Sequence, residues 1–102
     1  MQTPTQTTLD ETTAGYIASL FEALSDPTRV RIVSILVNGE TNVGELAAQL
    51  GMSASAISHQ VRILRDKRLL RTRKQGRYVF VALDDEHIAG LYQRGLEHAL
   101  HR

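Results

Sequence analysis

The fold of this chain is constrained most by a change in its hydrophobic period at Leu69-Leu70. Before this point, residues 43–50 and 54–65 each repeat apolar side chains at helical spacing, and the two segments meet at Gly51. After it the helical period ends, and residues 71–74 and 78–82 are predicted strands on either side of Gln75-Gly76, where glycine supplies the positive φ of a tight turn. Two short helices followed by a hairpin predict a mainly α protein with a β-hairpin wing, the winged helix-turn-helix.

Capping residues indicate where the helices begin. Four helical patterns each follow a side chain suited to a helix N-cap, namely Asp26, Asn42, Ser53 or Asp84. A further pattern runs from residue 9 to residue 24. We expect residues 1–8, which are rich in threonine, to form a flexible N-terminal arm. Residues 9–102 are then one winged helix-turn-helix domain for DNA binding and dimerisation.

Composition excludes several classes of protein. At 102 residues and 42% hydrophobic content, the chain suits one domain with a compact core. It has no cysteine, which excludes disulfides, thiolate metal sites and thiol redox switches. It shows neither a secretory signal nor an apolar run of membrane-spanning length. We therefore expect a cytoplasmic protein with no membrane partner.

The net charge of +1 conceals a strongly basic segment, residues 62–77, which we name the basic band. The band holds eight basic residues against the single acid Asp66, whereas the rest of the chain has four basic and ten acidic residues. Its basic members are Arg62, Arg65, Lys67, Arg68, Arg71, Arg73, Lys74 and Arg77. Such segregation predicts a surface for a polyanion, since each neutralised phosphate releases counterions. The alternative is a charged face that is merely solvated.

The basic band overlaps the two elements with which a winged helix contacts DNA. The second helix of the helix-turn-helix enters the major groove, where hydroxyl, amide, imidazole and guanidinium groups reach base edges and phosphates. The tip of the hairpin adds groups suited to the backbone or the minor groove. The candidate DNA-binding residues are therefore Ser53, Ser55, Ser58, His59, Gln60, Arg62, Lys74, Gln75 and Arg77.

A second set of candidate residues lies on the last predicted helix, with Asp85 and His87 at its start and His98 and His101 at its end. On an ideal helix, His87 and His98 are about 16 Å apart along the axis and within about 20° of the same face. The two pairs are therefore too far apart to share one ion within a chain. Two antiparallel copies of the helix would bring opposite ends together, so the spacing predicts a homodimer with two equivalent metal sites.

The donor types suit a borderline divalent ion such as Zn(II) in a tetrahedral site. Asp85 and His87 can chelate together only if Asp85 lies in an irregular first turn, because residues two apart on a regular helix point away from each other. The alternative is that all these residues are solvated. The helix dipole alone would then favour the acids at one end and the histidines at the other.

From about Phe21 to its end, the chain resembles the ArsR/SmtB family of bacterial metal-sensing repressors. The resemblance is carried by ALSDPTR at 23–29, VGELA at 43–47, SASAISHQV at 53–61 and RKQGR at 73–77. It implies an apo homodimer that represses transcription at double-stranded operator DNA and is released by Zn(II). It also implies an intersubunit site on the C-terminal helices, as in zinc and cobalt sensors, with the ligands Asp85, His87, His98 and His101.

The resemblance also narrows the metal ion. The cysteine site of the family would lie in residues 43–49, and this segment has no cysteine, which excludes the thiolate arsenic, cadmium and lead sensors. Nickel sensors of the family add ligands from chain extensions, whereas this chain ends one residue after His101 and has no histidine in its N-terminal arm. Ni(II) is therefore expected less than Zn(II), while Co(II) would fit almost as well as zinc.

Two other functions stay open. One is a winged-helix repressor of the same family that zinc does not regulate, or that senses Ni(II) or Co(II). The other is a metal-buffering or hydrolytic zinc protein. A catalytic zinc site needs an open coordination position and a general base, whereas four protein ligands close the predicted site. We therefore expect that the chain is not an enzyme.

Overall fold

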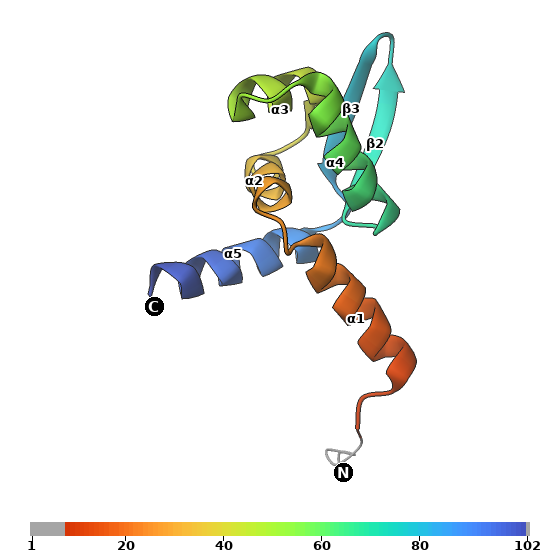
Figure 1. Cartoon of the computed structure of the whole chain (residues 1–102), viewed down its shortest axis with the longest axis vertical. Coiled ribbons are helices and arrows are strands. Elements are labelled where there is room, and N and C mark those ends of the chain that lie inside the picture. The colour runs from red at the N-terminus through yellow and green to blue at the C-terminus, as the bar shows by residue number, and fades with distance from the viewer. Residues whose placement is uncertain (1–7, 102) are drawn as a thin grey trace.

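The structure is a computed structural model that describes residues 8–101. Within this range the elements are α1 (Glu11–Ala23), α2 (Pro27–Leu36), β1 (Thr41–Asn42), α3 (Val43–Leu50), α4 (Ala54–Asp66), β2 (Leu70–Gln75), β3 (Tyr78–Leu83) and α5 (Glu86–Leu100). α3 and α4 form the helix-turn-helix, and the hairpin of β2 and β3 lies beside α4 (Figure 1). The predicted winged helix-turn-helix is confirmed. Of the predicted arm, residues 1–7 lie outside the described residues.

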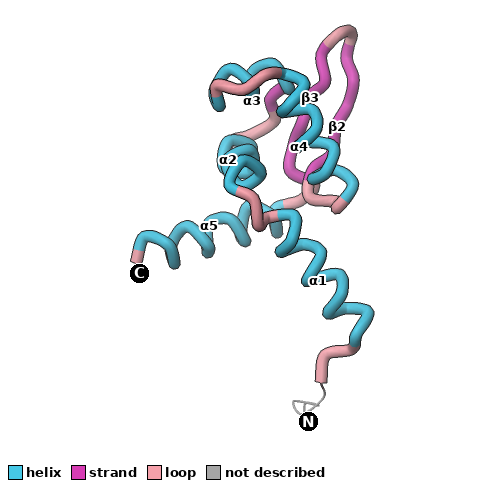
Figure 2. The backbone as a smooth tube through the Cα atoms, viewed as in Figure 1, coloured by secondary structure: helices cyan, strands magenta, loops and turns pink. Residues whose placement is uncertain are grey.

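The hairpin of β2 and β3 (Figure 2) belongs to an antiparallel sheet of three strands in the order β1-β3-β2. β1 was not predicted, because two residues are too few to show an alternating period. Gln75 pairs with Tyr78, so the turn residues are Gly76 and Arg77, one position later than predicted. Gly76 has the expected positive φ, 62°.

The core of the molecule includes the apolar face of α4. Ile57, Val61 and Leu64 are at most 4% exposed, as their spacing predicts. They join a cluster formed with α2, α3 and the sheet, whose other fully buried side chains include Ile32, Val33, Leu46, Leu69 and Val81. Burial of one such aliphatic side chain contributes about 1.5–3 kcal/mol. This packing fixes which face of α4 is turned to solvent.

Side-chain caps begin α2, α3 and α4 as the sequence predicts. Asp26, Asn42 and Ser53 each accept a hydrogen bond from the backbone N–H three residues later, at 2.9–3.1 Å. Each cap satisfies one of the N–H groups that the first helical turn leaves without a partner.

The predicted cap of α5 is wrong by one residue. The N-cap is Asp85, whose carboxylate accepts from the N–H of His87 at 2.8 Å, and not Asp84. Asp84 stays with the sheet instead. Its N–H donates to the carbonyl of Leu69 at 2.9 Å, and its own carbonyl accepts from Arg71 at 3.0 Å.

α1 and α5 extend away from the core (Figure 1). They leave large apolar side chains in solvent, including Tyr16, Ile17, Phe21, Leu96 and Leu100. With α2 they also line a groove of about 400 Å³, which we name the apolar groove; its residues are Phe21, Leu24, Val30, Val33, Leu91, Tyr92, Gly95, Leu96 and Ala99. A contiguous apolar surface of this kind marks an interaction site. Among residues 8–101, no helix is both long and apolar enough to cross a membrane.

α3 and α4 end in the same hydrogen-bonding pattern, the Schellman motif. The chain turns at Gly51 after α3 and at Arg68 after α4, and both residues have a φ of 65°. In each case the N–H of the next residue donates to the carbonyl five residues back, at 3.0 Å after α3 and 2.9 Å after α4. A residue with a side chain is strained in this left-handed conformation, so Arg68 carries a cost that Gly51 does not.

Substitutions at these two positions are expected to change stability in opposite directions. Arg68→Gly relieves strain and is expected to raise the free energy of unfolding by about 1 kcal/mol. Gly51→Ala is expected to lower it by about 1–2 kcal/mol. A Cβ at Gly51 would meet no heavy atom within 4 Å, so backbone strain is the only local cost. Urea unfolding at fixed protein concentration measures the free energy of unfolding of both variants. A loss in Arg68→Gly or a gain in Gly51→Ala would contradict the assignment of strain to the left-handed conformation.

Candidate nucleic-acid interface and metal site

α4 presents most of its predicted DNA-binding side chains to solvent. Ser55, His59 and Arg62 are exposed, and Ser58 is half-buried. Ser53 is also the N-cap of the helix, and its hydroxyl oxygen lies 3.4 Å from that of Ser55. The exposed face of α4 therefore carries hydroxyl, imidazole and guanidinium groups together.

Two grooves lie between α4 and the hairpin. The larger, of about 350 Å³, is lined by Ser58, Arg77 and Tyr78 together with residues at the starts of α3 and α4. The smaller, of about 180 Å³, is lined by Ser58, Arg62 and Thr72 among others. Ser58 of α4 thus lines both grooves. Arg62 lines one of them and Arg77 the other.

Acidic partners neutralise only part of the basic band. Three of its members form ion pairs, namely Arg65, Lys67 and Arg73. Within residues 8–101 the members without an acidic partner in an ion pair are Arg62, Arg68, Arg71, Lys74 and Arg77. These include every basic residue that the sequence predicts to bind DNA.

Both glutamines predicted to contact DNA have their amide oxygen already occupied. Gln60 is half-buried, and its Oε1 accepts a hydrogen bond from Nη1 of Arg29 at 3.1 Å. Oε1 of Gln75 accepts from Nη1 of Arg73 at 2.5 Å. The amide NH₂ is then the group of each side chain that is left to form a hydrogen bond with DNA. The helical period gives no sign of the contact between Gln60 and Arg29, because these residues are 31 positions apart in the sequence.

Glu40, which the sequence did not single out, anchors the hairpin. Arg73 donates from Nε and Nη2 to the two carboxylate oxygens of Glu40, at 3.1 and 2.9 Å. The guanidinium also lies over the ring of Phe80, 4.5 Å from its centroid. The hydrogen bonds from Arg73 lower the pKa of Glu40 and, in turn, raise the pKa of Arg73. This bidentate pair holds β2 against the segment that enters β1.

At the start of α5, Asp85 and His87 lie together. The backbone of Asp85 is extended, with φ −158° and ψ 177°, so this residue precedes the first helical turn. Its Oδ1 lies 3.2 Å from Nδ1 of His87, and the imidazole is 86% exposed. Asp85 is therefore the N-cap and not a residue of the first turn, and its extended backbone lets its side chain lie on the same side as that of His87.

At the other end of the same helix, His98 and His101 are both exposed. Nδ1 of His101 lies 2.7 Å from the carbonyl oxygen of Glu97. A carbonyl can only accept, so Nδ1 is the donor in this contact, and in the neutral imidazole Nε2 then has the lone pair that a metal ion requires.

A single chain does not complete a metal site. Within residues 8–101, no three histidine, aspartate or glutamate side chains come close enough to hold one ion. Each end of α5 offers two donors, whereas a closed zinc site takes four. Among the described residues, each pair could therefore hold a zinc ion in a closed site only together with donors from a second chain.

The chain is similar to known bacterial transcription regulators. Residues 26–72 match the family described as bacterial regulatory protein, arsR family. A transcriptional repressor SmtB homolog of Synechocystis sp. is 45% identical over 85 residues, which cover 83% of this chain and 64% of that protein. The chain thus spans less than two thirds of that relative. The HTH-type transcriptional regulator NmtR of Mycobacterium tuberculosis is 39% identical over 93 residues, covering 91% of this chain and 78% of NmtR.

The fold is also that of a solved repressor structure. The crystal structure of the AntR antimony-specific transcriptional repressor aligns with a TM-score of 0.81 and 29% sequence identity. The alignment covers 100% of this chain and 98% of that one. The similarity therefore extends over all the helices and the hairpin, α5 included.

The pair of Glu40 and Arg73 is expected to stabilise the protein in a pH-dependent way. Because the pKa of Glu40 in the folded state lies below its ordinary value of 4.5, the contribution is present above pH 4.5 and is lost as the pH falls through the lowered pKa. Urea unfolding of the wild type and Glu40→Gln, from about pH 3 to about pH 7, measures it. The stability difference is expected to shrink on the acid side. A difference independent of pH would contradict the role of the ion pair.

Proposed function

The chain belongs to the ArsR family of bacterial regulatory proteins, and on that premise we propose that it is a metal-responsive transcriptional repressor. As an apo homodimer it binds double-stranded operator DNA, and Zn(II) bound between its C-terminal helices releases it. The observation that supports the proposal is the position of two side chains with donor atoms suited to a metal ion at each end of α5, Asp85 with His87 and His98 with His101. The named relatives are transcription regulators, so no enzymatic activity is proposed.

The DNA-binding part of the proposal is supported by the surface around α4. The helix buries one face in the core, so its opposite face is free to enter a major groove. Arg62 on this face and Lys74 and Arg77 at the hairpin have no acidic partner within residues 8–101. Their charge is therefore available to DNA phosphates, with the hairpin placed to follow the DNA backbone.

A second copy of the chain is proposed to cover the apolar groove. Antiparallel pairing of α5 with its copy would place Asp85 and His87 opposite His98 and His101, and the exposed Leu96 lies between the two ends. Gly95 lines the apolar groove, and a Cβ there would meet no heavy atom of its own chain within 4 Å. The groove thus has room for a second helix close to the backbone of α5.

The donor set fits Zn(II). Three imidazoles and one carboxylate complete a tetrahedral site with ligands of the type that zinc prefers. Nε2 of His101 is free, and within residues 8–101 Oδ2 of Asp85 has no hydrogen-bond partner. A divalent ion held by one pair of donors from each chain would join α5 of one protomer to α5 of its partner.

The chain's own contacts connect the pair of Asp85 and His87 to the hairpin. Asp84, which precedes the proposed ligand Asp85, accepts a hydrogen bond from Arg71 of β2 and donates one to the carbonyl of Leu69. A shift at the start of α5 is therefore expected to move the end of β2 that lies beside α4. If the metal-bound dimer spaces its two α4 helices wrongly for the operator, DNA affinity falls by the coupling free energy, about 1–3 kcal/mol.

Membership of the family does not by itself fix the metal ion. The solved relative AntR is named as antimony-specific. This chain has no cysteine, so its side chains offer a metal ion nitrogen and oxygen donors and no thiolate. Among ions that nitrogen and oxygen donors hold, Co(II) is the nearest alternative to Zn(II), and Ni(II) is the weaker one. A repressor of the same fold that no metal regulates is the other alternative.

Zinc titration of the apo protein bound to a fluorescent operator duplex tests the proposal. Operator affinity is expected to fall about 5–150-fold when one ion is bound per protomer. His87→Ala and His98→Ala are each expected to bind zinc weakly. A mixture of the two variants is expected to regain one tight site per heterodimer, because one of its two sites then has all four ligands. Failure of the mixture to regain a site would exclude an intersubunit site.

Arg62→Ala and Arg77→Ala test the DNA-binding surface. Each is expected to weaken operator binding and to reduce the slope of log affinity against log salt concentration by about 1, the effect of one lost phosphate contact. Arg31→Ala is the matched control, since Arg31 is an exposed arginine on α2 outside the basic band. Fluorescence anisotropy over a series of salt concentrations measures the slopes. Equal slopes in all three variants would contradict the assignment.

A further inference from the structure

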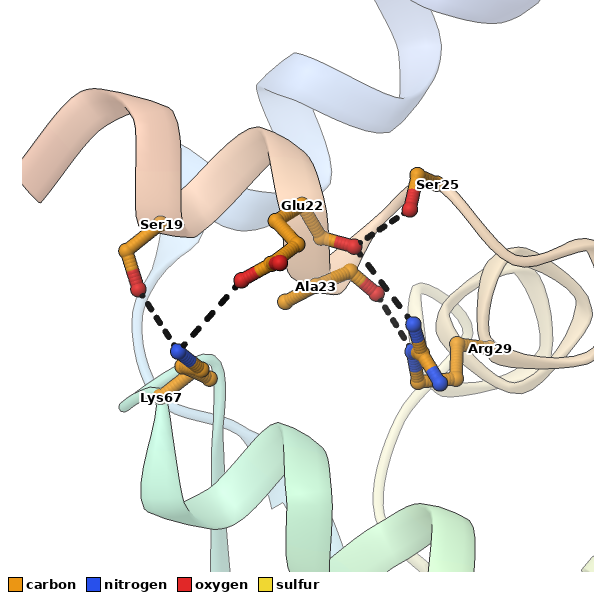
Figure 3. Close-up of polar contacts among 6 residues, drawn as sticks. All are labelled: Ser19, Glu22, Ala23, Ser25, Arg29 and Lys67. Atoms are coloured by element: carbon orange, nitrogen blue, oxygen red, sulfur yellow. Dashed lines mark hydrogen bonds and ion pairs between the residues drawn. The ribbon is translucent and has the colours of Figure 1, made fainter.

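Arg29, near the start of α2, joins the end of α1 to the middle of α4. Its Nε donates to the carbonyl of Ala23 at 2.6 Å, and its Nη2 donates to the carbonyl of Glu22 at 3.4 Å (Figure 3). Its Nη1 donates to Oε1 of Gln60 at 3.1 Å. One planar guanidinium therefore has acceptors on two helices, a geometry that a lysine cannot reproduce.

The acceptors on α1 are chemically suited to a cation. The last carbonyls of a helix lack intrahelical partners and form the negative end of its dipole. The carbonyl of Glu22 also accepts from the hydroxyl of Ser25 at 2.6 Å (Figure 3). Side chains that follow α1 in the sequence thus bind its last turn, together with the backbone N–H of Ser25, which donates to the carbonyl of Glu22 at 3.0 Å.

Lys67, at the end of α4, makes a second connection to α1. Its Nζ donates to the hydroxyl of Ser19 at 3.0 Å and lies 3.7 Å from Oε1 of Glu22 (Figure 3). These side chains are partly exposed, so the ion pair adds little to the free energy of unfolding. Its effect is on orientation, because two points of attachment along α4 restrict how α1 can rotate against it.

Polar contacts matter for α1 because few of its side chains are buried. Ala23 is the one residue of α1 that is fully buried. Tyr16, Ile17 and Phe21 are exposed, and Phe21 lines the apolar groove. The direction in which α1 leaves the core is therefore set largely at its last turn, where Arg29 and Lys67 bind.

We propose that Arg29 and Lys67 are positioning residues that fix the recognition helix α4 relative to α1. This inference rests on the proposed function, in which a second copy covers the apolar surface to which α1 contributes. α1 is then held by the dimer, and the contacts of Arg29 and Lys67 transmit the arrangement of the dimer to α4. Gln60 belongs to this connection and not to the surface that contacts DNA.

Gln60→Glu separates the two roles of Gln60. If the side chain serves Arg29, a carboxylate makes a charge-assisted hydrogen bond there, and the apo protein is expected to bind the operator within about threefold of wild type. If the side chain contacts DNA, a negative charge beside the phosphates lowers affinity by more than about tenfold. His59→Glu is the matched control, because it adds the same charge at the adjacent, exposed position of α4. An equal loss in both variants would overturn the assignment of Gln60.

Arg29→Lys tests the connection without changing the charge. Zinc affinity and the dimer dissociation constant are expected to equal those of wild type, whereas the ratio of operator affinities without and with zinc is expected to fall about tenfold. Lys67→Met is expected to lower this ratio about threefold. Arg65→Met also removes a cation near the end of α4, but Arg65 pairs with Asp66 and not with α1, so the ratio should stay unchanged. Wild-type ratios in Arg29→Lys and Lys67→Met would overturn the proposal.

Failure of the proposed function would be recognised separately, in the wild type. If zinc leaves the operator affinity of the wild type unchanged, the metal response is absent. The role of Arg29 in connecting α1 to α4 is then tested by the operator affinity of the apo protein alone. A loss of operator affinity of about tenfold in Arg29→Lys, at an unchanged melting temperature, supports the role of Arg29, and an unchanged affinity overturns it.

Discussion

The burial of Ile57, Val61 and Leu64 is the interaction on which the other features of this structure depend. These side chains place α4 against α2, α3 and the sheet, and so determine which residues of α4 face solvent. The same core receives Leu69 and Val81, which fixes the hairpin beside the helix. The grooves lined by Ser58, Arg62 and Arg77 exist because both elements share this core. The orientation of the polar surface of α4 is thus set by apolar packing.

The sequence was informative where local chemistry decides and uninformative where distant residues meet. Helix starts at Asp26, Asn42 and Ser53 were predicted because a cap acts within three residues. The start of α5 was misplaced by one residue, since Asp84 and Asp85 are equivalent caps until the sheet engages the backbone of Asp84. The contact of Gln60 with Arg29 and the role of Glu40 left no periodic signal. The spacing within α5 predicts which ends would face each other in a dimer, but the contacts between two chains depend on side chains that no local pattern identifies.

The role of each basic residue depends on whether an acidic side chain pairs with it, as well as on its position in the sequence. The basic band looks uniform in sequence, but in the structure its members serve different purposes. Arg73 is bound to Glu40 and holds the hairpin, and Lys67 reaches back to α1. Arg62 and Arg77 remain without acidic partners among the described residues. The acids outside the band therefore act selectively, converting some cations into structural contacts and leaving others for a polyanion.

Asp85 illustrates how closely a helix boundary and a proposed ligand are combined in this fold. Its carboxylate begins α5 by accepting from the backbone of His87, and the same group lies 3.2 Å from the imidazole of His87. Attempts to re-engineer the metal preference through this position would therefore also alter the start of the helix. Asparagine is the replacement best suited to keep the cap while removing the charge. A substitution of this proposed ligand therefore also changes the start of α5, unless the new side chain keeps the cap as asparagine does.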